Sequence, residues 1–184
     1  MKTDRRVQKT KKLLTDALIR LMLKKSFDAI TIQDILDEAN VGRSTFYTHY
    51  ENKEQLLLDG HANLNVKLFG TETGSMDFLP LFEHILGHRQ LAKALFGDKA
   101  GNIMISFLKN NAAALIKKHY ATRFSKTKGE QYRLRYLSEA SASAVMSLLG
   151  SWIGDDFFLS TQQMASLCSQ TVQSVFEGNA ATAN

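Results

Sequence analysis

Apolar and polar positions between residues 30 and 53 follow one another at the spacing of two short helices. The apolar positions of the first helix stand at offsets of 0, 3, 4 and 7: Ile32, Ile35, Leu36 and Ala39. This spacing places all four on one buried face. Thr31 comes just before that face and Asp34 follows three residues later, so each side chain can bond a backbone amide at the helix start. The pattern predicts a capped helix.

A tight turn and a second helix follow directly. Asn40, Val41 and Gly42 suit a sharp connection, and Phe46 and Tyr50, four residues apart, give the next helix its inner face. Its outer face carries side chains that can form hydrogen bonds: Arg43, Ser44, Thr45, Tyr47, Thr48 and His49. None of these is acidic, so the face suits an anionic surface. The segment is therefore predicted to form a helix-turn-helix that fits the major groove of DNA.

The stretch from Ala39 to Leu56 contains the pattern Val-x-x-x-Thr-Phe-Tyr-x-His-Tyr-x-Asn-Lys-Glu-x-Leu. This pattern resembles the DNA-binding signature of TetR-type transcriptional regulators, with residues 31–50 as the reading motif. The likeness runs over residues 7–68, and it implies a three-helix DNA-binding domain followed by a connecting helix. Many relatives have serine or threonine where this chain has Gly42, which can cap a helix but brings no hydroxyl to it.

Periodic apolar positions predict helices along the rest of the chain, so the expected fold is all-α. The first helix should span residues 6–25, with Phe27 tucked beneath the core that its inner stripe builds: Leu14, Leu18, Leu21 and Met22. Asn52 is expected to cap a long helix over 53–69 that joins the DNA-binding domain to the body of the protein. Further helices are predicted over 77–87, 89–96, 99–124, 130–154 and 161–177.

Composition agrees with this organisation. Of the 184 residues 44% are apolar, and one proline in such a length favours helices over a β-rich fold. The polar loop 70–75 is the expected boundary between the DNA-binding domain, residues 7–68, and a larger ligand-binding and dimerisation domain, residues 75–178. A single cysteine, the absence of a secretory leader and the lack of a membrane-length apolar run predict a cytoplasmic protein.

Charge and side-chain chemistry assign roles within the helix-turn-helix. Residues 1–53 hold 11 lysines and arginines against 7 acidic residues, a net charge of +4 that suits a double-stranded DNA partner. Thr31 and Lys53 are predicted to anchor phosphates. Tyr47 and His49 are predicted to reach the DNA backbone. The remainder are predicted to address base edges: Gln33, Arg43, Ser44, Thr45 and Thr48. Arg43 is the candidate for a guanine contact, because its fork matches O6 and N7.

The last two predicted helices carry stripes of small and apolar side chains that indicate a homodimer interface. The first stripe consists of Tyr136, Ala140, Ala144, Met146, Ser147, Leu148 and Gly150. The second consists of Met164, Leu167, Cys168, Thr171, Val172 and Val175. A two-fold axis would double the readable site, which predicts a palindromic operator. The alternative is that both stripes fill the core of the monomer.

The TetR resemblance also implies a pocket for a small-molecule effector within the C-terminal helices. Aromatic and sulfur side chains are the candidates for its lining: Phe82, Met104, Phe107 and Tyr136. Aromatic residues at helical spacing are also typical of an ordinary core, so this alternative stays open. The resemblance predicts a ligand-responsive regulator, commonly a repressor, while an activator of the same fold is an alternative.

Other functions have weaker support. His84 and His88 are four residues apart, but they lack the intervening glutamate of a zinc protease pair. The chain contains no nucleotide-binding glycine loop and no serine nucleophile motif, so neither an enzyme nor a cofactor is expected. A helical adaptor, or a small-molecule-binding protein with a vestigial DNA-binding domain, are the alternatives. The basic N-terminus and the intact outer face of the second helix favour DNA binding.

Overall fold

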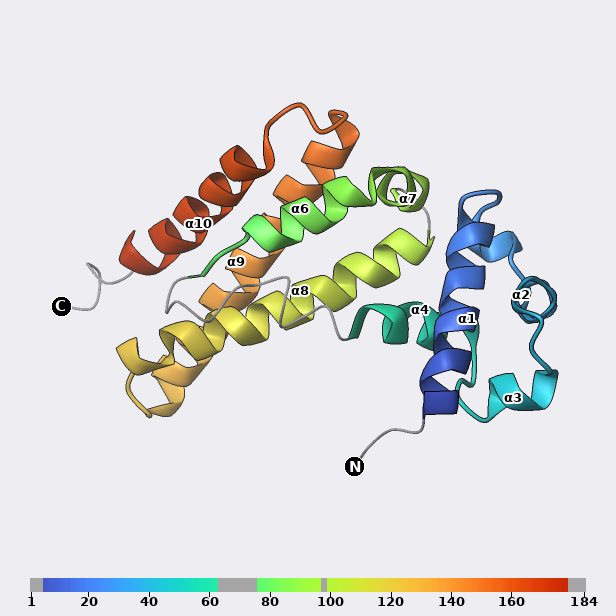
Figure 1. The fold of residues 1–184 in the computed structure, drawn as a ribbon. Coiled ribbons are helices and arrows are strands. Elements are labelled where there is room, and N and C mark those ends of the chain that lie inside the picture. The colour runs from blue at the N-terminus through green and yellow to red at the C-terminus, as the bar shows by residue number, and fades with distance from the viewer. Residues whose placement is uncertain (1–4, 63–75, 97–98, 179–184) are drawn as a thin grey trace. The chain divides into compact units, whose positions relative to one another are not determined.

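The computed structural model describes residues 5–62, 76–96 and 99–178, and every regular element in these ranges is a helix (Figure 1). The all-α prediction is therefore confirmed. The helices of the N-terminal region are α1 (Arg5–Met22), η1 (Phe27–Ala29), α2 (Ile32–Ala39), α3 (Arg43–Tyr47) and α4 (Lys53–Ala62). Those that follow are α6 (Leu79–Gly87), α7 (Arg89–Leu95), α8 (Lys99–Tyr120), η2 (Ala121–Arg123), α9 (Lys128–Gly154) and α10 (Thr161–Gly178).

The helices form two compact units. The first contains residues 5–62 together with the described part of 90–104, and the second contains 76–89 and 105–178. The start of α8 therefore groups with the N-terminal helices, although it lies within the predicted domain 75–178. The predicted boundary loop 70–75 lies outside the described residues, as do the last seven positions of the helix predicted over 53–69.

The core of the first unit lies where α1 packs against α2 and α4. The predicted inner stripe of α1 is confirmed, because all four side chains are buried: Leu14, Leu18, Leu21 and Met22. Phe27 and Phe46 are buried too, and so are three of the four apolar residues of α2: Ile35, Leu36 and Ala39. Ile32, the fourth, is half-buried. The helical period of the sequence thus predicted which face of each short helix points inward.

The second unit is built around α10, which packs against both α9 and α6. Phe82 of α6 meets Trp152 of α9 edge to face, with ring centroids 5.1 Å apart. At the other end, the rings of Tyr120 and Phe176 are stacked with centroids 3.8 Å apart. Large aromatic side chains therefore close the core at both ends of α9 and α10. None of the described helices combines the length and apolar character that crossing a lipid bilayer requires.

The stripes predicted for a dimer interface divide between the core and the surface. Four of their residues are buried within the protomer: Met146, Met164, Cys168 and Val172. Assigning these four to an interface was wrong, because the helical period turns them inward within the unit formed by α6, α9 and α10. Other members of the stripes are exposed: Tyr136, Ala140, Ser147 and Leu167. Burial raises the pKa of the Cys168 thiol to about 12.

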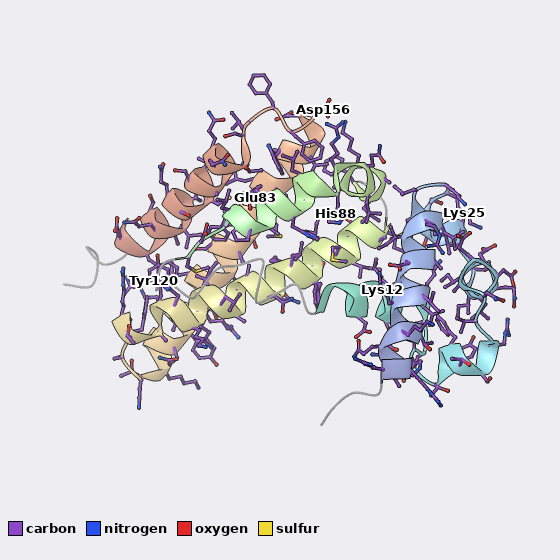
Figure 2. All side chains as sticks on the ribbon, in the orientation of Figure 1. Lys12, Lys25, Glu83, His88, Tyr120 and Asp156 are labelled. Carbon is purple, nitrogen blue, oxygen red and sulfur yellow. The ribbon has the colours of Figure 1, made fainter. Side chains whose placement is uncertain are left out.

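The loop between α9 and α10 begins with a left-handed helix end (Figure 2 labels Asp156 there). The backbone N–H of Phe157 donates to the Trp152 carbonyl at 2.8 Å, and that of Asp156 donates to the Ile153 carbonyl at 3.2 Å. These two bonds form a Schellman motif. Asp156 and Phe157 have φ angles of 56° and 60°, a region that favours glycine. The Trp152 indole N–H donates to the Leu159 carbonyl and holds the loop in place.

Candidate nucleic-acid interface

Thr31 and Asp34 fix the start of α2. The Thr31 side chain accepts a hydrogen bond from the Asp34 backbone N–H, and the Asp34 carboxylate accepts one from the Thr31 N–H at 2.7 Å. The predicted reciprocal cap is therefore confirmed. Lys25, labelled in Figure 2, adds an ion pair of 2.8 Å to the same carboxylate. Its hydrogen bond, together with those from Thr31, holds the pKa of Asp34 well below its usual range.

The turn between α2 and α3 is a second Schellman motif. Asn40 has a φ of 51°, and the Val41 N–H donates to the Leu36 carbonyl at 3.1 Å. Gly42 then occupies the N-cap of α3 in extended conformation, without a side-chain bond to the helix. Asparagine tolerates the left-handed conformation because its short polar side chain interacts locally with the backbone. This turn sets the direction in which α3 leaves α2.

The outer face of α3 is open, as the sequence predicted. Its exposed side chains are Arg43, Ser44, Tyr47 and Thr48, while Thr45 and His49 are half-buried. Phe46 and Tyr50 are buried on the opposite side. The Thr48 hydroxyl donates to the Ser44 carbonyl at 2.9 Å, so it is already engaged within the helix. The exposed face offers a guanidinium, hydroxyl groups and a phenol to a partner.

Arg43 and Gln33 bring α3 and α2 together at this surface. An Arg43 guanidinium N–H donates to Gln33 Oε1 at 3.4 Å, and the Gln33 amide donates to Asp37 at 2.8 Å. Both side chains are exposed and belong to the set predicted to contact base edges. Nearby, Glu38 pairs with Arg20 at 2.6 Å, and this bond lowers the pKa of the Glu38 carboxyl. An acidic group of α2 is thus neutralised from α1.

A network of three side chains links α1 and α4 to the segment that follows α3. Its members are Lys11 of α1, Tyr50 after α3 and Asp59 of α4. The Tyr50 hydroxyl donates to Asp59 Oδ2 at 2.6 Å, and Lys11 Nζ lies 3.0 Å from the same oxygen. Burial opposes the charge on Asp59, but the bonds from Tyr50 and Lys11 outweigh it and lower the pKa of the carboxyl. Burial and the bond to Asp59 raise the pKa of Tyr50. No local pattern in the sequence predicts this network, since its members lie 9 to 48 positions apart.

Lys53 makes contacts that the sequence did not predict. Its ammonium donates to the carbonyls of Phe27 and Ile30 at 2.6 and 2.7 Å, and it lies 4.5 Å from the centroid of the Phe27 ring. The residue predicted to anchor a phosphate thus holds the η1 segment against the start of α4. Asn52 caps α4 through a 2.8 Å bond from the Gln55 N–H, which confirms the predicted cap.

The four residues predicted to line an effector pocket have different surroundings. Phe82 is fully buried against Trp152, while Phe107 is half-buried. Met104 is buried in the first unit. Tyr136 is 56% exposed, and its ring stacks on that of Tyr132 with centroids 6.1 Å apart.

The paired histidines lie together at the end of α6. The ring centroids of His84 and His88 are 4.4 Å apart, and His88 Nδ1 lies 2.8 Å from the His84 carbonyl oxygen. Among the described residues, no three histidine, cysteine or acidic side chains are grouped so as to hold a metal ion.

Comparison with known proteins decides the family. A family model described as "Bacterial regulatory proteins, tetR family" matches residues 14–59, and one described as "Transcriptional regulator C-terminal region" matches residues 75–174. The chain belongs to the TetR family of transcriptional regulators. In a TetR-family protein, α2 and α3 are the DNA-binding helix-turn-helix, so the resemblance stated from the sequence is confirmed.

Relatives of this TetR-family regulator share mainly its N-terminal region. It is 46% identical over 55 residues to the uncharacterized HTH-type regulator YxbF of Bacillus subtilis, a match covering 29% of this chain and 14% of YxbF. It is 35% identical over 48 residues to DhaS of Lactococcus lactis, the dhaKLM operon activator, covering 26% of each protein. The chain thus spans less than a third of the length of YxbF and of DhaS.

Solved structures match over most of the chain. A TetR transcriptional regulator from Streptococcus agalactiae 2603V superposes with a TM-score of 0.59 at 28% identity, covering 92% of this chain and 96% of that one. Lin0861 from Listeria innocua gives a TM-score of 0.66 at 21% identity, covering 94% of both chains. Over most of its length, the C-terminal helices included, the chain therefore shares the fold of these two structures.

Proposed function

We propose that this TetR-family regulator reads a palindromic operator through direct contacts from α3 and from Gln33 of α2. The observation that carries the proposal is the open, acid-free outer face of α3, where Arg43 lies beside Gln33. A bidentate arginine suits guanine, whereas an amide suits adenine. The hydroxyls of Ser44 and Thr45, with Tyr47, Thr48 and His49, complete the surface along bases and backbone. Residues 7–68 are the proposed DNA-binding domain.

Selection of bound sites from a random duplex library tests this proposal. The recovered sites are expected to be palindromes with half-site centres about 34–36 Å apart or a multiple of it. Arg43→Ala is expected to lose about 1–3 kcal/mol at one position of each half-site and to relax the base preference there. Lys118→Ala, which removes one exposed charge from α8, is the control and should leave that preference unchanged. Equal losses by Arg43→Ala on specific and scrambled DNA would reduce Arg43 to a backbone contact.

We further propose that residues 75–178 form a homodimerisation and ligand-binding domain, and that the protein acts as a repressor released by a small, largely apolar effector. Exposed small side chains on α9 and an exposed leucine on α10 support the interface: Ala140, Ser143, Ser147 and Leu167. Small residues allow close helix approach. Ser147→Arg on α9 is expected to yield monomers in analytical ultracentrifugation. Gln173→Arg, at an exposed position of α10 away from Leu167, should leave the dimer intact. A dimer that survives Ser147→Arg would place the interface elsewhere.

The repressor and ligand parts of the proposal have a separate test. A reporter placed behind the selected operator is expected to be silenced by the protein in cells, and activation instead would reverse the sign of regulation. An effector that binds the DNA-incompetent state about 100-fold better would shift the equilibrium by roughly 2.7 kcal/mol per site. A compound found by thermal-shift screening should therefore weaken operator binding. Stabilising compounds that leave operator affinity unchanged would contradict the ligand response.

A further inference from the structure

The end of α6 carries two histidines, His84 and His88, whose rings lie next to each other (Figure 2 labels His88). The residues are four apart, so their side chains stand on the same face of the helix. The ring centroids are 4.4 Å apart and the ring planes are inclined by 39°. His88 is exposed and His84 is half-buried. Both residues belong to the second unit, so the geometry of the pair is set within one compact part of the structure.

The hydrogen bond of His88 determines which of its ring nitrogens can bind an ion. Its Nδ1 lies 2.8 Å from the His84 carbonyl oxygen. Because a carbonyl oxygen only accepts, Nδ1 carries the hydrogen, and in the neutral ring Nε2 keeps its lone pair. Histidines that bind metal ions almost always donate their other ring N–H to a carbonyl, a carboxylate or water, and this bond fixes the direction of the ring. The backbone of α6 therefore orients His88 as a metal ligand.

The spacing of the two rings suits bonds to one metal ion. With metal–nitrogen bonds of about 2.0–2.1 Å, the centres of two imidazoles on one ion lie roughly 4.5–5 Å apart. Small side-chain rotations bring the observed 4.4 Å into this range, because His88 is exposed. Each imidazole has two nitrogens, so His84 can bind an ion through one and keep another contact through the other. Zinc protease helices hold their metal with two histidines at this same spacing.

We propose that His84 and His88 form a two-histidine site for a late first-row divalent metal ion: Cu²⁺, Ni²⁺ or Zn²⁺. Imidazole suits these ions, whereas Mg²⁺ and Ca²⁺ prefer oxygen ligands. Among the residues that the structure describes, no third histidine, cysteine or acidic side chain joins such a group, so water completes the coordination. The affinity is expected to follow the general order for nitrogen ligands, with Cu²⁺ binding more tightly than Ni²⁺ or Zn²⁺, and Mn²⁺ more weakly than all three.

A bound ion fastens the end of α6. His84 lies in the last turn of the helix, and His88 is its C-cap, whose backbone N–H already donates to the Ile85 carbonyl at 3.1 Å. The ion adds a second link between these two residues, and α6 in turn packs against α10. The division between the second and the first unit falls between residues 89 and 90, directly after this helix end. The site depends neither on the DNA contacts nor on the effector proposed above.

Titration of the full chain, carrying no affinity tag, with NiCl₂ in a calorimeter tests the site, and thermal unfolding is measured alongside. Wild-type protein is expected to bind one Ni²⁺ per chain and to unfold at a higher temperature in its presence, because an ion that binds only the native state stabilises it. His84→Gln and His88→Gln should each weaken binding at least about 10-fold, since losing only the hydrogen-bond partner of a ligand costs about 10–100-fold. His119→Gln is the matched control, because no second histidine lies within one helical turn of it.

The exposed position of His88 keeps the test usable if His84→Gln folds poorly. Three results overturn the site: no Ni²⁺ binding by wild type at millimolar concentration, MgCl₂ binding as tightly as NiCl₂, or Ni²⁺ binding that His88→Gln leaves unchanged. Binding that His119→Gln weakens as much as His88→Gln does also overturns it, because the ion then lies elsewhere. Ni²⁺ binding that the folded His84 and His88 variants lose and that His119→Gln keeps supports the site, whether or not operator affinity changes.

Discussion

Replacing Lys53 with methionine separates a structural role from a DNA contact. The substitution keeps an apolar stem and removes the ammonium that donates to the Phe27 and Ile30 carbonyls at 2.6 and 2.7 Å. A hydrogen bond to a charged group contributes about 1.5–3 kcal/mol. Because Lys53 is only half-buried and water can replace part of each bond, we expect Lys53→Met to lower the free energy of unfolding by about 2–3 kcal/mol.

Urea unfolding followed by circular dichroism measures this loss, and operator titrations at several salt concentrations measure the DNA contact. Lys12→Met is the matched control for stability, since the Lys12 side chain is 76% exposed and pairs with Asp16 one turn away, an arrangement that contributes at most about 0.5 kcal/mol. Lys118→Met, at an exposed position of α8, is the control for the salt dependence of operator binding. If Lys53 acts by holding η1, operator binding by folded Lys53→Met depends on salt concentration as it does in wild type. The reasoning would be refuted if stability were unchanged and the slope of log operator affinity against log salt concentration fell in magnitude by about 0.9, the value for one phosphate contact. Lys53 would then be a phosphate anchor after all.

Three further substitutions test the local geometry. Gly42→Ser should stabilise α3 by a few tenths of a kcal/mol in urea unfolding, because a Cβ there meets nothing nearer than 3.9 Å and the hydroxyl can cap the helix; a lower stability would mean that the cap cannot form. Asp156→Gly should raise stability by about 1 kcal/mol by relieving a left-handed aspartate, and no gain would show that its side-chain contacts matter more. Tyr50→Phe removes a bond that lowers the pKa of Asp59, so unfolding on acidification should begin at higher pH than in wild type. The sign follows from linkage: a carboxyl with a lowered folded pKa stabilises above its unfolded pKa of about 3.9, and this is lost as pH falls through the folded value. If both proteins unfold at the same pH, the ion pair with Lys11, and not the bond from Tyr50, keeps the pKa of Asp59 low.

The sequence predicted those features whose causes lie within one or two helical turns. Thr31 and Asp34 cap α2 because both partners are three residues apart, and Asn52 caps α4 for the same reason. The period of 3.6 residues also predicted the inward side of α1 and the open side of α3. Among the described residues, helix ends were placed within a few residues, except that α8 ends at Tyr120 and continues as η2 rather than as one helix to residue 124. The end predicted at residue 69 lies outside the described residues.

Features that depend on distant partners could not be predicted in this way. Lys53 meets carbonyls 23 and 26 residues earlier, and no local pattern distinguishes it from a lysine that waits for a phosphate. On α9 and α10, small and apolar side chains are compatible with a core and with an interface alike. The packing of α10 between α9 and α6 decides between them, and it buries Met146 and Cys168 within the protomer.

The contacts around α4 bear on the ligand response proposed above. Lys53 ties its first turn to η1, and Asp59 ties its second turn to Tyr50 and Lys11. At Gly60 the helix approaches α1 so closely that a Cβ would lie 2.8 Å from a Thr15 methyl carbon. Fixed at both turns, Lys53–Ala62 cannot tilt without moving α1 and the segment that follows α3. In the ligand response proposed above, an effector that changes the direction of α4 therefore also reorients the outer face of α3. No flexible joint between the two helices takes up the movement.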